Sequence, residues 1–361
     1  MPFCKKITPC YEFNLSSVKE NYSYWKSICA KNGRTDIPAY SIKANYDKEI
    51  LKTIKKLDGT FEVCSYLEYQ YLRKLGIASK NIIVNGTAFS KKNLKKILKS
   101  GTLIIADSEK IIKDICELNI KCNIGLRCNL DYIKTDKNIF FNKISRFGIT
   151  HIEEIISFLL KYKKVNLICL QAHFSGNTRE PSVFKLIAKT LCEIILHHNL
   201  KNISRIDIGG GYKVSRKYWN IRDYYESVLN VLKEKQMKYL KIIFEPGNSI
   251  VRNCGKYYTA IIDIKKINGT IYCIANGSII HLPFLKGKNF KNYRIQNSKN
   301  TKEEKQYIVG STCKESDVLA ELTNEPALKI GSIVEFYNIG AYSINEIPEF
   351  IINKPKVYYL K

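Results

Sequence analysis

Eight short apolar runs, each followed by a segment with helical spacing, constrain the fold of this chain more than any other feature. Each run has the length and composition of a buried β-strand. The runs are residues 39–42, 61–64, 82–84, 103–106, 123–127, 167–171, 205–208 and 242–244. Between two of them Ile50, Ile54 and Leu57 recur at helical spacing, and Gly76 marks the expected end of the next helix. This alternation predicts an α/β fold, a TIM-like (β/α)8 barrel, with a doubly wound open sheet as the alternative.

Beyond residue 254 the alternation stops. Strand-like runs at 257–264, 270–275, 306–309 and 332–337 follow one another with no long helical segment between them, which predicts an antiparallel β domain. Residues 6–13 also have strand composition, and we expect them to pair into that same sheet. The predicted domains are a barrel at 28–254 and a β-sandwich or β-barrel domain formed by 1–27 and 255–361. The polar, Lys- and Asn-rich residues 286–305 predict a surface loop.

The charge of the chain is unusual, with 59 Lys and Arg against 33 Asp and Glu, a net charge of +26. The lysines are spread over nearly every predicted helix and loop instead of gathering on one arm, which argues against nucleic-acid binding. The chain has no apolar stretch long enough for a membrane span, and its N-terminus lacks the apolar core of a secretory signal. We therefore expect a cytoplasmic protein.

The twelve cysteines form no C-x-x-C pair, and no His is placed to complete a zinc site, so we expect no bound metal. In a reducing compartment most of them are expected to be small core residues. Cys313 differs because it lies in a polar, loop-like segment. It is therefore the cysteine that we single out for a chemical role.

In a (β/α)8 barrel the reactive side chains follow the carboxyl ends of the strands. Polar residues stand at nearly every one of these positions, namely Lys43, Glu62, Ser65, Asp107, Arg127, His173, Asp207 and Glu245. The seventh run ends in three glycines, Gly209, Gly210 and Gly211, whose main-chain N–H groups can cradle a phosphate. We therefore expect the active site at this end of the barrel, with a phosphate bound at the glycines.

Lys43 stands next to apolar residues at the first strand end, where burial can remove its proton and make it a nucleophilic amine. A phosphate cradle, an imine-forming Lys43, a ring-stacking His173 and a carboxylate at Glu245 are together the parts that hold pyridoxal 5′-phosphate. Glu245 would keep the pyridine nitrogen protonated. The sequence thus predicts this cofactor.

With these residues the chain resembles the fold type III pyridoxal-phosphate decarboxylases. This family includes the ornithine, diaminopimelate and arginine decarboxylases and shares the alanine racemase-like barrel. The resemblance covers nearly the whole chain. Its motifs, in order, are Thr8-Pro-Cys-Tyr-Glu-Phe, Tyr40-Ser-Ile-Lys-Ala-Asn, Glu62-Val-Cys-Ser, Asp107-Ser, Ser145-Arg-Phe-Gly, His173, Asp207-Ile-Gly-Gly-Gly-Tyr, Glu245-Pro-Gly, Cys313-Lys-Glu-Ser-Asp and Gly340-Ala-Tyr.

The resemblance implies that Lys43 carries the cofactor as an imine, that His173 stacks on its ring and that Glu245 pairs with its nitrogen. Further cofactor contacts that it implies are Glu62, Arg127, Ser175, Gly209, Gly210, Gly211, Gly247 and Tyr342. It also implies a homodimer in which Cys313 enters the partner's active site as the acid, with Asp317 four positions on. The spacing from Cys313 to Asp317 and the Gly340-Ala-Tyr motif belong to the decarboxylase branch, so decarboxylation is favoured over racemisation.

Departures from the family pattern bear on the substrate. The residue after Cys313 is commonly acidic in the ornithine and diaminopimelate enzymes, but here it is Lys314, which would repel a diamine; Glu315 could take its place through a register shift. With Asp317, these residues are the expected substrate contacts. Asn248 replaces a common arginine, and His173-Phe-Ser-Gly replaces His-x-Gly-Ser.

From Lys314 and the basic surface we expect an amino-acid moiety on a larger, phosphate-linked intermediate of a siderophore or peptide-nucleotide antibiotic, as in microcin C-type maturation. The alternatives are a decarboxylase of a free basic amino acid or diaminopimelate, a racemase, and a non-catalytic regulatory homologue.

Overall fold

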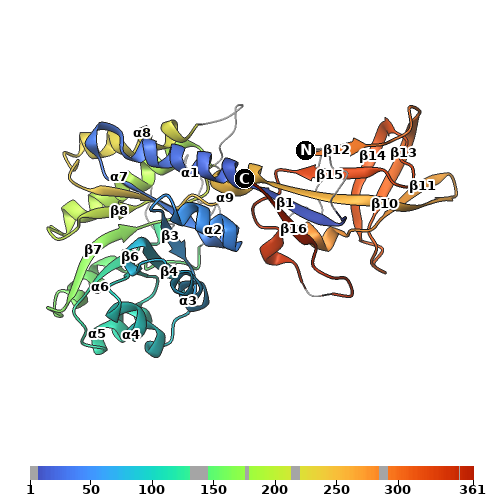
Figure 1. Ribbon diagram of the computed structural model, residues 1–361. Helices are drawn as coiled ribbons and strands as arrows, with labels where there is room; N and C mark the ends of the chain where they lie inside the picture. The colour runs from blue at the N-terminus through green and yellow to red at the C-terminus, as the bar shows by residue number, and fades with distance from the viewer. Residues whose placement is uncertain (1–6, 131–144, 175–178, 213–219, 284–291, 349) are drawn as a thin grey trace. The chain divides into compact units, whose positions relative to one another are not determined.

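The computed structural model describes residues 7–130, 145–174, 179–212, 220–283, 292–348 and 350–361 (Figure 1). The chain divides into two compact units. The barrel unit comprises Asn21–Lys43 and Leu51–Ser249, and the sheet unit comprises Met1–Glu20, Ala44–Ile50 and Ile250–Lys361. The sequence-based boundaries placed 1–27 with the second domain, whereas here the chain joins the barrel unit from residue 21, inside the first helix, and returns to the sheet unit at 44–50.

Eight parallel strands close the barrel, which confirms the predicted TIM-like fold and excludes the open sheet. They are β2 (Ile37–Ser41), β3 (Thr60–Val63), β4 (Ile82–Gly86), β5 (Leu103–Ala106), β6 (Cys122–Arg127), β7 (Val165–Gln171), β8 (Arg205–Asp207) and β9 (Lys241–Phe244). Each overlaps one of the eight apolar runs, and β2 pairs with β9 to complete the ring. Part of the core is a buried cluster of small and branched side chains from these strands, Ala39, Ile83, Ile105, Ile168, Cys169 and Ile243.

Helices alternate with the barrel strands, as the spacing predicts. They are α1 (Leu15–Cys29), α2 (Lys48–Lys55), α3 (Tyr66–Lys74), α4 (Lys91–Lys99), α5 (Glu109–Glu117), α6 (Ile152–Leu159), α7 (Pro181–His197), α8 (Ile221–Glu234) and α9 (Asn248–Val251). The side chains of Ser65, Ser90 and Ser108 cap α3, α4 and α5 by accepting a backbone N–H. Gly76, at φ 71°, lies directly beyond the end of α3, where it was expected. Among the described residues, no helix has the length and apolar character needed to cross a membrane.

The sheet unit contains a mostly antiparallel sheet, as predicted. Its strands are β1 (Cys10–Asn14), β10 (Gly255–Ile267), β11 (Thr270–Ala275), β12 (Tyr293–Gln296), β13 (Lys302–Val309), β14 (Val318–Pro326), β15 (Ile333–Tyr337) and β16 (Lys356–Leu360). The strand order is β12-β15-β10-β11-β13-β14, and the expected N-terminal strand β1 pairs antiparallel with β10 and parallel with β16.

The prediction of a surface loop at 286–305 is wrong in part. β12 lies inside this range, and β13 begins at Lys302. β12 pairs with β15 and β13 pairs with β14, so both are held by partners that follow them in the chain. Their polar residues fit a sheet with half-exposed strands, which a composition rule interprets as a loop.

Candidate active site

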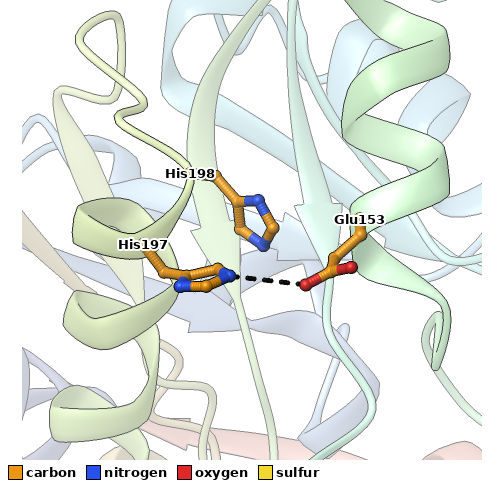
Figure 2. Close-up of side chains that lie close together, drawn as sticks. All are labelled: Glu153, His197 and His198. Atoms are coloured by element: carbon orange, nitrogen blue, oxygen red, sulfur yellow. Dashed lines mark ion pairs between the residues drawn. The ribbon is translucent and has the colours of Figure 1, made fainter.

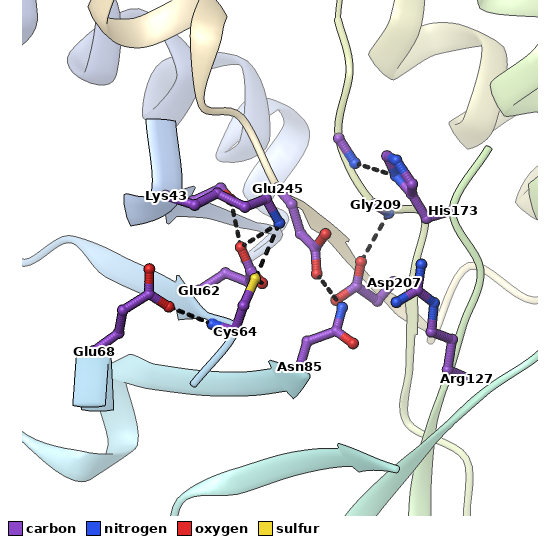
Figure 3. Close-up of polar contacts among 12 residues, drawn as sticks. Lys43, Glu62, Cys64, Glu68, Asn85, Arg127, His173, Asp207, Gly209 and Glu245 are labelled. Carbon is purple, nitrogen blue, oxygen red and sulfur yellow. Dashed lines mark hydrogen bonds and ion pairs between the residues drawn. The ribbon is translucent and has the colours of Figure 1, made fainter. Parts of the chain in front are cut away.

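Seven side chains gather where the barrel strands end (Figure 3). Lys43 follows β2, Glu62 lies in β3, Asn85 in β4, Arg127 ends β6, His173 follows β7, Asp207 ends β8 and Glu245 follows β9. All are residues of the barrel unit. The structure therefore brings together the predicted strand-end residues of the barrel and adds Asn85 to them.

Lys43 is held by a carboxylate and a thiol. Its Nζ lies 3.3 Å from Glu62 Oε2 and 3.2 Å from Cys64 Sγ. Glu62 is fully buried; the hydroxyl of Ser41 donates to its Oε2, and the thiol of Cys64 donates to its Oε1 at 3.1 Å. Glu62 thus ties the ends of β2 and β3 to the lysine.

The pKa of Lys43 is raised, contrary to the expectation that burial would make it a neutral amine. Burial lowers this pKa, but the nearby Glu62, Cys64 and Glu245 more than offset that effect. Burial and then Glu62 raise the pKa of Cys64, so this residue is a neutral thiol. In the cofactor-free protein Lys43 is therefore an ammonium, and its proton must leave before the nitrogen can attack a carbonyl.

Two carboxyl groups, Asp207 and Glu245, are buried close enough for the charge of Glu245 to raise the pKa of Asp207. Burial and then Glu62 raise the pKa of Glu245 to about 7, while Lys43 and the Asn85 amide act in the opposite direction. Burial and then Glu245 raise the pKa of Asp207 well above its usual value. Asp207 accepts the N–H of Gly209 at 2.9 Å. Burial and the charge of Glu245 both favour the neutral form of Asp207, whereas the charge of Lys43 favours the carboxylate of Glu245.

His173 is a neutral ring. Burial, and then the positive charges of Arg127, Arg179 and Lys43, lower its pKa to about 3. Its Nδ1 accepts the N–H of Gly210 at 3.1 Å, which leaves the ring proton on Nε2. Arg127 forms an ion pair with Asp107 at 3.1 Å. A neutral, fixed imidazole is suited to stacking on an aromatic ring.

The glycine run could not carry side chains. A Cβ on Gly209 would lie 2.5 Å from His173 Nδ1, one on Gly210 would lie 2.3 Å from the Glu245 carbonyl oxygen, and one on Gly211 would lie 2.3 Å from Arg179 Nη1. Gly209 and Gly211 also have positive φ angles of 68° and 97°. The run leaves a backbone loop beside His173 and Glu245, as a phosphate cradle requires. The donor set of a lysine, a carboxylate, a flat ring and this loop therefore fits pyridoxal 5′-phosphate.

Three further predicted cofactor contacts remain, namely Ser175, Gly247 and Tyr342. Ser175 lies outside the described residues. Gly247 is buried between β9 and α9. Tyr342, in the sheet unit, has φ 54°, and its N–H donates to the Ala44 carbonyl at 2.8 Å.

The loop that carries Cys313 is built on Asp317. Cys313, Lys314 and Glu315 are exposed, and the Lys314 ammonium lies 4.2 Å from the centre of the Phe350 ring. Asp317 is buried, and its carboxylate accepts hydrogen bonds from Ser278, from the Ile279 N–H and from both the N–H and the hydroxyl of Thr312. Within the chain Asp317 therefore holds the loop, and Lys314 packs on an aromatic ring.

Sequence reasoning missed Asn85 and Cys64 as site residues. Asn85 Nδ2 donates to Glu245 Oε1 at 2.9 Å. The rule that polar residues at barrel strand ends are functional would have found Asn85, because it lies in the β4 run just before Gly86. Cys64 was grouped with the core cysteines, and its position one residue beyond β3 is the signal that separates it from them.

Comparisons with known proteins place this geometry in context. The family described as pyridoxal-dependent decarboxylase, pyridoxal binding domain, matches residues 15–252. The diaminopimelate decarboxylase of Helicobacter pylori is 26% identical to this chain. The alignment covers 98% of this chain and 90% of that protein. The diaminopimelate decarboxylase of Methanocaldococcus jannaschii is 23% identical, with 94% and 82% covered.

Two solved structures share the fold. The Helicobacter pylori diaminopimelate decarboxylase complexed with L-lysine superposes with a TM-score of 0.85 at 22% identity. The superposition covers 99% of this chain and 93% of that structure. The Paramecium bursaria Chlorella virus arginine decarboxylase bound to agmatine has a TM-score of 0.83 at 19% identity, with 99% and 97% covered. The likeness extends over both units of the chain.

Proposed function

Because this chain belongs to the family of pyridoxal-dependent decarboxylases, we propose that it removes the α-carboxylate from a free amino acid, with diaminopimelate as the first candidate. The chain is a carboxy-lyase that uses pyridoxal 5′-phosphate. The observation that carries the choice of substrate is that the diaminopimelate decarboxylase of Helicobacter pylori aligns over 98% of the chain.

The bound cofactor supplies an electron sink for the pair that remains on carbon when the carboxylate leaves as carbon dioxide. In this proposal Lys43 provides the covalent anchor, and Gly209, Gly210 and Gly211 bind the phosphate. His173 would support the ring face, and the Glu245 carboxylate would accept a hydrogen bond from the protonated ring nitrogen.

A carboxylate lies next to the Lys43 ammonium and can accept its proton. Nζ must lose it to bond to a carbonyl, and Glu62 Oε2 lies 3.3 Å away. The Cys64 thiol and the Ser41 hydroxyl donate to Glu62 and keep its oxygens fixed at this place. Glu62 thus orients the lysine and is placed to receive its proton.

A larger, phosphate-linked substrate lacks support. That expectation depended on Lys314 meeting an anion, but its ammonium lies over Phe350 within its own unit. The regulatory-homologue alternative is also disfavoured, because Lys43, His173 and Glu245 stand together at one strand end of the barrel. The chain's relatives named above are decarboxylases, which favours loss of carbon dioxide over racemisation.

We also propose that the enzyme is a homodimer in which the partner supplies Cys313. The thiol is exposed on a loop that the buried Asp317 fixes, so it is available to a second copy of the chain. There it would give its proton to the carbon that has lost the carboxylate.

The test of this function is carbon dioxide release by the purified holoenzyme from meso-diaminopimelate, ornithine, lysine and arginine. The proposal predicts release from diaminopimelate with lysine as product, lost in Lys43→Ala and retained in Lys92→Ala, a change at an exposed lysine of α4. Release from another free amino acid alone would replace diaminopimelate as the candidate substrate. No release from any of the four, with racemisation or with turnover of a larger conjugate, would overturn the proposal.

A further inference from the structure

The Asn85 amide is buried in the barrel mouth and is oriented by a carboxylate. Asn85 is 5% exposed, and its Nδ2 donates to Glu245 Oε1 at 2.9 Å (Figure 3). The opposite amide orientation would set Oδ1 against the Glu245 oxygen, which repels it. The contact therefore fixes both the amide and one oxygen of the carboxylate.

The amide oxygen of Asn85 lacks a hydrogen-bond partner, unlike its nitrogen. Asn85 Oδ1 is buried and has no hydrogen-bond partner among the described residues. A buried acceptor without a partner destabilises the fold, so an amide retained for structure alone is expected to be paired on both sides. Asn129, 6% exposed, is such a case, because it donates to the Ser145 carbonyl at 2.9 Å and has no unpaired buried atom in the described chain.

Charged side chains around Glu245 shift its pKa in opposite directions. Glu62 on β3 favours its neutral form, whereas Lys43 and Arg127 favour its carboxylate. Asn85 is an uncharged side chain that donates to Glu245 Oε1. A hydrogen bond to a charged acceptor is stronger than one to a neutral acceptor, so this contact favours the charged form.

We propose that Asn85 is a positioning residue that keeps Glu245 ionised and turned toward the ring nitrogen of the cofactor. Asn85 acts through Glu245 and does not itself contact the reacting atoms. This inference rests on the cofactor chemistry of the family and not on the substrate proposed above.

The test follows the Glu245 carboxyl by carbon NMR in the cofactor-free protein and measures the dissociation constant of pyridoxal 5′-phosphate. Asn85→Leu keeps the branched shape of the side chain and removes the donor, and we expect Glu245 to bind its proton about tenfold more tightly. Because the pKa of Glu245 is about 7, the ionised fraction at pH 7.5 then falls about threefold and cofactor binding weakens at least as much. Asn85→Asp is the isosteric second variant, and its added acidic group should shift Glu245 in the same direction.

Asn129→Leu is the matched control, since it removes an equally buried amide away from Glu245, and it should leave the Glu245 titration unchanged. In a Glu245→Gln background, Asn85→Leu should change cofactor affinity less than twofold. An unchanged Glu245 titration in both Asn85 variants, or an equal shift in Asn129→Leu, would overturn the proposal. No substrate enters these measurements, so they stand apart from a failure to find diaminopimelate turnover.

A second, independent observation lies on the outside of the barrel (Figure 2). His197 Nε2, at the end of α7, lies 3.4 Å from Glu153 Oε1 on α6, and one ligand atom each from Glu153, His197 and His198 all lie within 4.8 Å of one another. Two zinc ligands at bonds of about 2.0–2.1 Å in a tetrahedron stand about 3.3 Å apart. The carboxyl end of the 17-residue α7 also favours a cation.

Against the sequence-based expectation of no bound metal, we infer that Glu153, His197 and His198 bind Zn²⁺, with the fourth position taken by water, and that the ion links α6 to the end of α7. Two imidazoles and one carboxylate are a ligand set that zinc accepts. The group is empty here. It is exposed in part, so a metal can reach it from solvent.

Titration calorimetry with zinc chloride on the chelator-treated holoenzyme tests this site. One ion should bind, with affinity at least tenfold lower in His197→Ala, and zinc should raise the melting temperature of the wild type and of His151→Ala but not of His197→Ala. His151→Ala is the control, because His151 Nε2 also pairs with a glutamate, Glu109, at 3.5 Å but belongs to no three-ligand group among the described residues. Equal zinc affinity in the two variants, or no binding to the wild type, would overturn the site.

Discussion

At the scale of single residues, the barrel mouth is a set of groups whose protonation is set by their neighbours. Lys43 is a cation because Glu62 offsets its burial. His173 is neutral because burial and three cations disfavour its charged form. Burial raises the pKa of both Glu245 and Asp207, and the charge of Lys43 favours the carboxylate of Glu245. At the strand ends these groups lie close enough for each to set the ionisation of the next.

The low pKa of His173 predicts a pH dependence of stability. The unfolded chain binds the His173 proton below about pH 6.5 and the folded chain only near pH 3. The unfolded state therefore holds more protons between these values, and stability is lost as the pH falls through this window. The loss by pH 4.5 should be about 3 kcal/mol.

Urea unfolding of the wild type and of His173→Phe at pH 7.5 and 4.5 checks this prediction, because the aromatic variant lacks the titrating group. The difference between the two proteins should shrink or reverse at the lower pH. His151→Phe, at an exposed histidine, should show no such change. A pH-independent difference for His173→Phe would contradict the assignment of a neutral buried ring.

The glycine run offers a second prediction at this scale. Gly209 and Gly101 both have positive φ, 68° and 77°, so an alanine is strained at each by about 1–2 kcal/mol. A Cβ at Gly101 meets nothing within 4 Å, whereas one at Gly209 meets the His173 ring at 2.5 Å. Gly209→Ala should therefore destabilise the protein more than Gly101→Ala in thermal unfolding, and only Gly209→Ala should weaken cofactor binding. Equal effects of the two changes would exclude a role of the close approach.

At the scale of elements, the sequence predicted the barrel well and the second sheet less well. Each barrel strand is a short apolar run because parallel strands are buried on both faces, and their common direction places the following residues at one edge. β14 and β16 mix polar and apolar residues without a strict alternation, and β12 is four residues long, so local composition did not reveal them. β12 pairs with β15 and β16 pairs with β1, partners that are distant in sequence and that no local pattern encodes.

The same contrast explains what was predictable in the site. Lys43, His173 and Glu245 follow strands, so the barrel topology alone groups them. The partners of Asp317 could not be predicted, because Ser278 and Ile279 lie nearly forty residues earlier in the chain. Sequence analysis therefore gave Asp317 a substrate contact, while its oxygens are occupied by the loop that it holds.

A prediction for this element follows from those contacts. Asp317→Asn replaces one acceptor oxygen with an amide that cannot receive the Ser278, Ile279 and Thr312 donors together, so about 2–4 kcal/mol of stability should be lost. Asp263→Asn is the control, since Asp263 is exposed and accepts the adjacent Ile264 N–H, and it should cost under 0.5 kcal/mol. Chemical denaturation of the two variants checks this, and equal stability would contradict a structural role for Asp317.

At the scale of the whole molecule, the account joins a cofactor barrel and a sheet that carries Cys313 into one enzyme. If Cys313 acts in the partner's active site, a protein with Lys43→Ala and one with Cys313→Ala fail at different parts of a shared site. Random reassociation of equal amounts gives one half mixed dimers, each with one intact site, so about one quarter of wild-type activity should return. An activity of the mixture equal to the mean of its components would contradict shared sites.

The central claim is that Lys43 is the covalent anchor of pyridoxal 5′-phosphate. Its most direct test is borohydride reduction of the holoenzyme, proteolysis and mass spectrometry of the peptides. The account predicts the reduced cofactor on the peptide that contains Lys43, with no such mass in Lys43→Arg and an unchanged result in Lys92→Ala. A cofactor mass on another lysine, or a wild-type protein that carries none after reconstitution, would contradict it.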